Sequence, residues 1–330
     1  MADTKLIVIT GATGAQGGGV VNIMKRTPGW RVRAVTRNPE SDAAKKLSAD
    51  GTVEVVRADY DDETSLLNAF SGATAIFAVT NFWEPLFRLG ASQHEAGAIE
   101  ERQAMNIARA AAQIPTLEHY IWSTQPSAKD ATDGELEVPH MDCKARVDAR
   151  IKQELPDLAQ KTTFLYVGYY PSNMAIFPMM RPSEDPTTGE YTQALATNPD
   201  ALILVAGDMS VNPGIWVRQI LAAGPVAHGK YTCMALERLS FRQMMDRWCA
   251  VTGRRGYVKQ VTEEEWTKNW GVAAREMAVQ FRFGERCDPW AKREGDGKEF
   301  ITPEELGIEE REVIGFEQTI RGLVERGLVV

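Results

Sequence analysis

The feature that most constrains the fold is a short apolar run that ends in three evenly spaced glycines. Residues 5–17 read KLIVITGATGAQG, so Gly11, Gly14 and Gly17 directly follow the apolar segment Leu6–Ile9. An uninterrupted apolar run of this kind is typical of a parallel strand that is buried on both faces. The glycines permit a tight turn, a close approach of the backbone to a pyrophosphate, and close packing of the next helix on the strand. The pattern therefore predicts a strand, turn and helix that hold a dinucleotide.

The residues after the glycines fit a helix that begins at this turn. Val20, Val21, Ile23 and Met24 recur at helical spacing, which is typical of a helix that packs by one face. The N-terminus of such a helix directs unpaired N–H groups and the positive end of its dipole toward a phosphate. The G-x-x-G-x-x-G spacing is the variant of short-chain dehydrogenases, and a tight turn that binds nothing is the alternative.

The rest of the chain alternates short apolar runs with helical stretches. The apolar runs are 6–9, 32–35, 53–56, 75–79, 120–122 and 164–167, and the helical stretches are 42–47, 64–70, 103–113 and 141–154. Alternation of this kind predicts an α/β Rossmann fold with a doubly wound parallel sheet. Several prolines interrupt regular structure after residue 167. We expect residues 1–168 to form an NAD(P)-binding Rossmann domain. We expect residues 169–330 to form a smaller, mixed α/β substrate-side domain that is intertwined with it and returns some segments to the sheet.

Composition excludes several classes of function. The 330 residues carry a formal net charge of −8, which argues against direct binding to nucleic acid. The first residues lack the basic and apolar regions of a secretory signal, and no apolar run approaches the ~18 residues that span a bilayer. The four cysteines lack metal-ligand spacing, so we expect reduced thiols and no metal. We expect a cytoplasmic protein, with the nucleus also open, and the sequence leaves the oligomeric state undetermined.

The end of the second predicted strand bears on the choice of cofactor. NAD-binding proteins usually place an acidic residue about 20 residues past the glycines to accept hydrogen bonds from the ribose. This chain has Arg37 there, next to Asn38. A planar guanidinium suits a 2′-phosphate, which favours NADP. The alternative is that Arg37 is a solvated loop cation.

Polar residues also follow the later strands, where ligands of open α/β sheets bind. Asp59 follows the third strand and is expected to accept a hydrogen bond from the adenine amino group. Thr80 and Asn81 follow the fourth strand and would line the path toward the nicotinamide. Ser123 ends the fifth strand, and residues 169–173 follow the sixth. Each of them has the alternative of being an ordinary polar residue at a strand end.

His140 and Lys144 stand four residues apart at the start of a predicted helix, so they share one helical face. In short-chain dehydrogenases a Tyr at the first position donates a proton to the carbonyl, and the Lys holds the ribose. A His replaces that Tyr here, and an imidazole can also act as an acid. The alternatives are a surface histidine at a helix start and a solvated lysine.

Five segments together resemble the NmrA-like family, an atypical branch of the short-chain dehydrogenases. That family contains fungal nitrogen-metabolite repression regulators and animal NADPH-sensor proteins. The segments are 11–17, 35–39, 58–62, 79–84 and 139–144. The resemblance extends over nearly the whole chain and includes residues 207–211 and 238–241.

The resemblance implies a set of cofactor contacts. They are Gly11, Thr13, Gly14, Ala15, Gln16, Gly17, Arg37, Asn38, Ala58, Asp59, Thr80, Asn81, Lys144, Tyr170 and Asn173. Two positions depart from the family. Met105 aligns with a Lys that reaches the cofactor in relatives, which would weaken binding. Ser41 stands where some relatives have a Lys near the 2′-phosphate.

Two functions follow from these residues. The absence of the Tyr favours an NADP(H)-sensing regulator that acts on a protein partner, and the resemblance suggests a transcription factor. The alternative is an NADPH-dependent reductase of a small aromatic or polyketide-like carbonyl or enone. In that case His140, Lys144 or a water held by Ser123 would assist protonation. Candidate pocket walls for a flat substrate are Phe82, Trp83, Tyr169, Tyr170 and Phe177, and core packing is the other account of these aromatics.

Overall fold

The computed structural model describes residues 4–287 and 297–329. In this part of the chain a seven-stranded parallel sheet has the order β10-β6-β5-β4-β1-β2-β3. Its strands are β1 Lys5–Ile9, β2 Trp30–Thr36, β3 Val53–Arg57, β4 Ala75–Ala78, β5 His119–Thr124, β6 Thr162–Val167 and β10 Tyr231–Met234. The strand order reverses between β1 and β4. The predicted doubly wound α/β fold is confirmed, and this reversal is where such sheets bind ligands.

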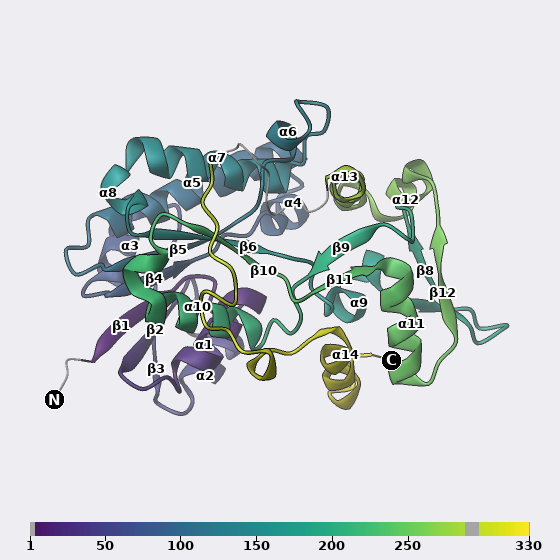
Figure 1. The fold of residues 1–330 in the computed structure, drawn as a ribbon, viewed down its shortest axis with the longest axis horizontal. Helices are drawn as coiled ribbons and strands as arrows, with labels where there is room; N and C mark the ends of the chain where they lie inside the picture. Colours follow the sequence, from purple (N-terminus) through teal and green to yellow (C-terminus); the bar gives the residue numbers. More distant parts are fainter. Residues whose placement is uncertain (1–3, 288–296, 330) are drawn as a thin grey trace.

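Helices cover both faces of this sheet (Figure 1). One face carries α3 Glu63–Phe70, α5 Gln93–Ala112, α7 Pro139–Glu154 and α8 Pro156–Ala159. The other face carries α1 Ala15–Met24, α2 Asp42–Ser48 and α10 Asn212–Ala223. Strand β1 feeds both cores, because Leu6 and Val8 point into the first while Ile7 and Ile9 point into the second. The continuous apolar run of β1 thus reflects a strand with no solvent-facing side.

Helix α5 is longer than the stretch 103–113 expected from periodicity, because it begins at Gln93. Its first turns are polar and show no apolar stripe. The start is instead marked by a capping box, in which Ser92 and Glu95 satisfy each other's backbone N–H groups. The extension matters for function, since it brings Glu100 to the end of the sheet where ligands bind.

The second half of the chain forms two smaller sheets and contributes to the large one. Its elements lie mainly in the right half of Figure 1. The strands are β7 Ser183–Glu184, β8 Tyr191–Leu195, β9 Leu202–Val205, β11 Glu237–Ser240 and β12 Gly256–Gln260. The helices are α9 Asn173–Ile176, α11 Phe241–Thr252, α12 Glu263–Trp270, α13 Val272–Arg286 and α14 Phe316–Glu325. Strand β10 pairs with β6, and α10 packs on α1. The division at residue 168 stays a prediction.

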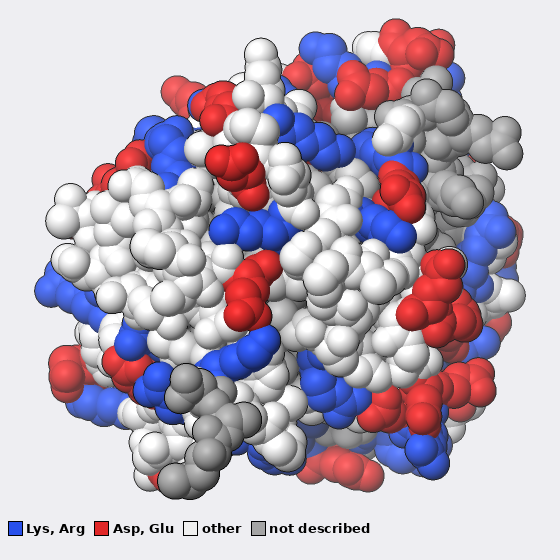
Figure 2. Space-filling model, turned by 60° about the vertical axis from the view of Figure 1, so that its left-hand side comes forward, with Lys and Arg blue, Asp and Glu red and all other residues white. Residues whose placement is uncertain are grey.

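The surface mixes charges of both signs. On the face drawn in Figure 2, Lys and Arg side chains are interspersed with Asp and Glu side chains. Within residues 4–287 and 297–329, no helix combines the length and the apolar character needed to cross a membrane.

Candidate functional site

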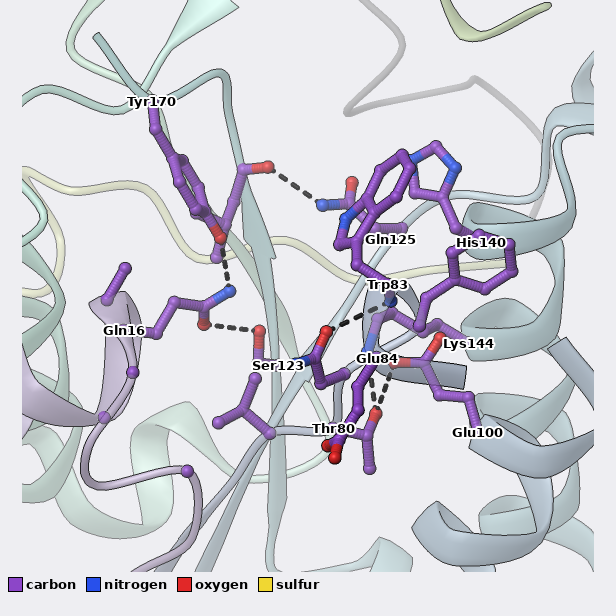
Figure 3. Close-up of a pocket in the computed structure, with 18 of the residues that line it drawn as sticks. Gln16, Thr80, Trp83, Glu84, Glu100, Ser123, Gln125, His140, Lys144 and Tyr170 are labelled. Atoms are coloured by element: carbon purple, nitrogen blue, oxygen red, sulfur yellow. Dashed lines mark hydrogen bonds and ion pairs between the residues drawn. The ribbon is translucent and has the colours of Figure 1, made fainter. Parts of the chain in front are cut away.

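A cavity of about 600 Å³ lies beyond the carboxyl ends of the central strands. It is lined by residues that follow successive strands of the sheet: Gly11 after β1, Arg37 after β2, Thr80 after β4, Ser123 in β5 and Tyr170 after β6. Volumes of this size are typical of small-molecule sites. Figure 3 shows the inner part of the cavity, where side chains from α1, β5, α5 and α7 converge.

The glycine turn lines this cavity, and its backbone geometry depends on glycine. Gly11 adopts a left-handed backbone with φ of 58°. A Cβ on Gly17 would lie 2.3 Å from the carbonyl oxygen of Gly11, so only glycine permits this packing. Helix α1 starts after Gly14 without a side-chain cap. The N–H groups of its first turn are therefore left for an anionic ligand.

A chain of hydrogen bonds ties the glycine turn to the middle of the cavity. The Ser123 hydroxyl donates to Gln16 Oε1 at 2.7 Å, and Gln16 Nε2 donates to the Tyr170 hydroxyl at 2.7 Å. Burial raises the pKa of Tyr170 to about 12, and the bond from Gln16 offsets part of that rise. Tyr170 is therefore a neutral phenol near pH 7. The chain fixes the amide of Gln16 between β5 and the segment that follows β6 (Figure 3).

The Lys144 ammonium is held on the opposite wall. Its Nζ lies 2.8 Å from Glu100 Oε1 and donates to Thr80 Oγ1 at 2.9 Å. Thr80 in turn donates to Glu100 at 2.7 Å. The Glu100 side chain is 1% exposed, and a buried carboxylate of this kind requires a partner charge. Lys144 also lies over the ring of Trp122, 5.1 Å from its centre, an arrangement that attracts a cation.

His140 is held by a carboxylate that sequence reasoning missed. Its Nδ1 lies 2.6 Å from Glu276 Oε1, and the same oxygen accepts from the His140 backbone N–H at 2.9 Å. Glu276 comes from α13, 136 residues further along the chain, and its side chain is 0% exposed. Burial alone would raise the pKa of Glu276, but His140 and Gln93 hold it below its usual value. No local sequence signal marks this glutamate.

Aromatic rings surround His140 at the cavity wall. Trp83 lies 5.4 Å from Phe82, 5.5 Å from Phe177 and 5.6 Å from His140, measured between ring centres. All five aromatics expected as pocket walls line the cavity, including Tyr169 and Tyr170. Flat apolar walls beside a few polar groups are suited to a planar ligand.

A further ion pair lines the cavity. Arg37 Nη2 donates to both carboxylate oxygens of Glu84 at 2.7 Å. The hydrogen bonds that Arg37 donates to Glu84, together with the negative charge of Glu84, raise the pKa of Arg37, against a smaller effect of burial. Glu84 stands inside the family-like segment 79–84 but was not singled out as a site residue.

Most of the predicted site residues line the cavity. They are Gly11, Thr13, Gly14, Ala15, Gln16, Gly17, Arg37, Asp59, Thr80, Asn81, His140, Lys144, Tyr170 and Asn173, and Ser123 lines it as well. Asn38 and Ala58 do not. The Asn38 side chain accepts from the Glu40 N–H in an exposed turn, and Ala58 is buried in the core.

The structure also shows where Met105 and Ser41, the two departures from the family, lie. Met105 is fully buried in the core between α5 and the sheet. Met105 does not line the cavity, which is reached from α5 by Glu100 and Gln103, and the expected loss of a cationic contact at this position stays a prediction. Ser41 caps α2 by accepting from the Ala44 N–H at 3.3 Å.

Comparison with known proteins gives consistent matches. The model of the NmrA-like family matches residues 3–289. The NmrA-like family domain-containing oxidoreductase hkm9 of Aspergillus hancockii is 29% identical over 281 residues, which cover 82% of this chain and 79% of that protein. The oxidoreductase cpsB of Aspergillus campestris is 29% identical, with 86% and 84% covered.

Solved structures share the fold. A structure of NmrA, a negative transcriptional regulator, in complex with NAD superposes with a TM-score of 0.79 at 21% identity and covers 98% of this chain and 97% of that chain. A complex of NmrA with NADP gives a TM-score of 0.77 at 20% identity, with the same shares covered. The NADPH complex of a quinone oxidoreductase from Escherichia coli gives 0.68 at 19% identity and covers 96% and 99%.

Proposed function

This chain belongs to the NmrA-like family, and we propose that it is an NADP(H)-dependent oxidoreductase that reduces a carbonyl or enone of a small, flat aromatic molecule. The observation that carries the proposal is the His140–Glu276 pair on the wall of the cavity. A buried carboxylate that orients an imidazole toward a ligand site is a recurrent arrangement for proton transfer. The two fungal relatives described above, hkm9 and cpsB, are named as oxidoreductases.

The cavity residues fit a nicotinamide dinucleotide. The glycine turn and the uncapped start of α1 suit the pyrophosphate, Arg37 suits a 2′-phosphate, and Lys144 with Thr80 suits the ribose next to the nicotinamide. When bound, the reduced nicotinamide supplies a hydride. Asp59 at the end of β3 stays the predicted partner of the adenine amino group.

The role that we assign to His140 is that of proton donor. Its Nδ1 is engaged by Glu276, and its Nε2 makes no hydrogen bond within the described residues. A protonated His140 would donate the Nε2 proton to the substrate oxygen as the carbonyl becomes an alcohol. Glu276 stabilises the imidazolium before the transfer and keeps the ring oriented afterwards. Phe82, Trp83 and Phe177 form the apolar wall against which a planar substrate would lie.

The test measures NADPH oxidation with a broad panel of aromatic carbonyls, enones and quinones. We expect His140→Gln to lower kcat on an active substrate by about 10²–10³-fold, with the Kd for NADP⁺ changed less than twofold. His94→Gln is the control, because His94 is an exposed residue outside the cavity. Glu276→Gln should also lower kcat, because the carboxylate that holds the ring and the backbone N–H of His140 is replaced by a neutral amide.

A cofactor-sensing regulator is the second candidate. It is favoured by the Lys144 ammonium, which Glu100 and Thr80 already hold, and by the absence of a Tyr at position 140. Such a protein would act through a protein partner, such as a transcription factor. Micromolar or tighter NADP(H) binding without turnover of any panel member would contradict the reductase and support the sensor. A wild-type protein that binds neither NAD(H) nor NADP(H) would contradict both.

A further inference from the structure

We propose that Glu84 sets the choice between NAD and NADP. It supplies the ribose-binding carboxylate that position 37 lacks and competes with a 2′-phosphate for the Arg37 guanidinium. The inference rests on the proposed function only in assuming that the cavity binds a nicotinamide dinucleotide. It does not require that any substrate is reduced.

The ion pair lies where the adenosine ribose of such a ligand is recognised. Arg37 directly follows β2, and Glu84 is the second residue of α4 Trp83–Arg88, which comes soon after β4. In the sheet, β2 and β4 are the two neighbours of β1. Their loops therefore flank the glycine turn that follows β1, and both side chains line the cavity. The Arg37–Glu84 ion pair therefore joins the loop that follows β2 to the helix that comes after β4.

The pair also neutralises the cation that a phosphate needs. Glu84 accepts two hydrogen bonds from Arg37 and a third from Arg88 Nη1 at 2.6 Å. Asp59 adds a second negative charge that acts on Arg37. The charges of Arg37, Arg88, Glu84 and Asp59 sum to zero. The nearby Asp61 is paired with Arg102. A phosphate would thus meet a neutral site with its best donor already engaged.

The two cofactors make opposite demands on this pair. The 2′-hydroxyl of NAD is a donor, and a carboxylate beside the glycine turn is the usual group that accepts from it. The 2′-phosphate of NADP is an acceptor with up to two negative charges, so it is attracted by Arg37 and repelled by Glu84. NADP can form its bidentate contact with Arg37 only after Glu84 has released the guanidinium. Glu84 therefore favours NAD, and Arg37 favours NADP.

The experiment measures Kd for NAD⁺ and NADP⁺ by isothermal titration calorimetry on the full-length protein. We expect Glu84→Gln to raise the affinity for NADP⁺ about tenfold, which is the change in affinity that one charge-assisted hydrogen bond contributes. The affinity for NAD⁺ should stay the same or fall. In an Arg37→Gln background, the same change should raise NADP⁺ affinity less than threefold, because only the direct repulsion by Glu84 remains once the guanidinium for which the two anions compete is gone.

Glu101→Gln is a matched control. Glu101 also pairs with two arginines, Arg146 and Arg150, and its side chain is 19% exposed against 24% for Glu84. It lies outside the cavity, so the ratio of NADP⁺ to NAD⁺ affinity should change less than twofold. The proposal is overturned if Glu84→Gln leaves this ratio unchanged or lowers it, since Glu84 would then be neutral or would orient Arg37 for the phosphate. Binding of neither dinucleotide by the wild type is a different result, which overturns the proposed function.

Discussion

At the scale of single residues, burial decides which ionisable groups keep their charge. His119 is 3% exposed, its Nε2 lies 2.8 Å from Thr163 Oγ1, and its ring meets His228 edge-on at 4.5 Å. Burial, and to a lesser degree the charge of His228, lower the pKa of His119 to about 3. The folded protein therefore keeps this imidazole neutral at pH values where an unfolded chain would protonate it.

The pH dependence of stability follows from that difference. Between pH 6.5 and 3 the unfolded state binds one proton more than the folded state at His119, so the free energy of unfolding falls as the pH falls. We expect the wild type to lose about 2 kcal/mol more than His119→Gln between pH 7 and pH 5. Gln retains an Nε2 donor for Thr163 and does not titrate. Urea unfolding at both pH values measures the effect.

The wild type must be compared with His119→Gln because a second buried group, Asp148, changes the free energy of unfolding with pH in the opposite direction. Burial raises the pKa of Asp148 to about 7, although Thr124, Tyr231 and Trp122 donate to it. The folded state therefore binds a proton at Asp148 that the unfolded state releases, so its contribution to stability is lost as the pH rises toward 7. If the free energy of unfolding changed equally between pH 7 and pH 5 in the wild type and in His119→Gln, the account of His119 would be contradicted.

At the scale of elements, glycines set how closely α1 approaches α10. A Cβ on Gly19 would lie 2.2 Å from the Met209 carbonyl oxygen, and one on Gly214 would lie 2.5 Å from the Gly19 carbonyl oxygen. The sequence indicated the glycine turn, but Gly19 was not predicted to have a role. Its partner segment lies about 190 residues away along the chain, where no local pattern points to it.

Alanine substitutions at the adjacent Gly18 and Gly19 distinguish the effect of close packing on stability from the effect of helix propensity. Gly19→Ala should lower the free energy of unfolding by about 1–3 kcal/mol, because the backbone of Met209 cannot move aside cheaply. Gly18→Ala should be neutral or stabilising by up to about 1 kcal/mol, since its Cβ would meet the Ala12 oxygen at an ordinary 3.5 Å and alanine favours the helix. Urea unfolding without cofactor compares the two, and equal stabilities would refute the role given to Gly19.

At the scale of the whole molecule, the second half of the chain completes both the sheet and the site. Strand β10 pairs with β6, α10 covers α1, and α13 delivers Glu276 to His140. We expect residues 1–168, expressed alone, to show no cooperative thermal unfolding by circular dichroism. The fragment lacks the β10 partner of β6 and exposes the apolar face that α10 covers. A fragment that unfolds cooperatively would instead support an independent domain that ends at residue 168.

The sequence by itself determined the elements and the glycine turn, because these depend on side chains that are near one another in the chain. Apolar runs located strands β1 to β6 of the sheet but not β10, and most residues expected around the cavity do line it. The tertiary structure alone decided which charges meet. It brings Glu276 to His140, Glu84 to Arg37 and Glu100 to Lys144, and it turns Met105 into the core. Such pairs are joined by the path of the chain in space, which local periodicity and spacing do not encode.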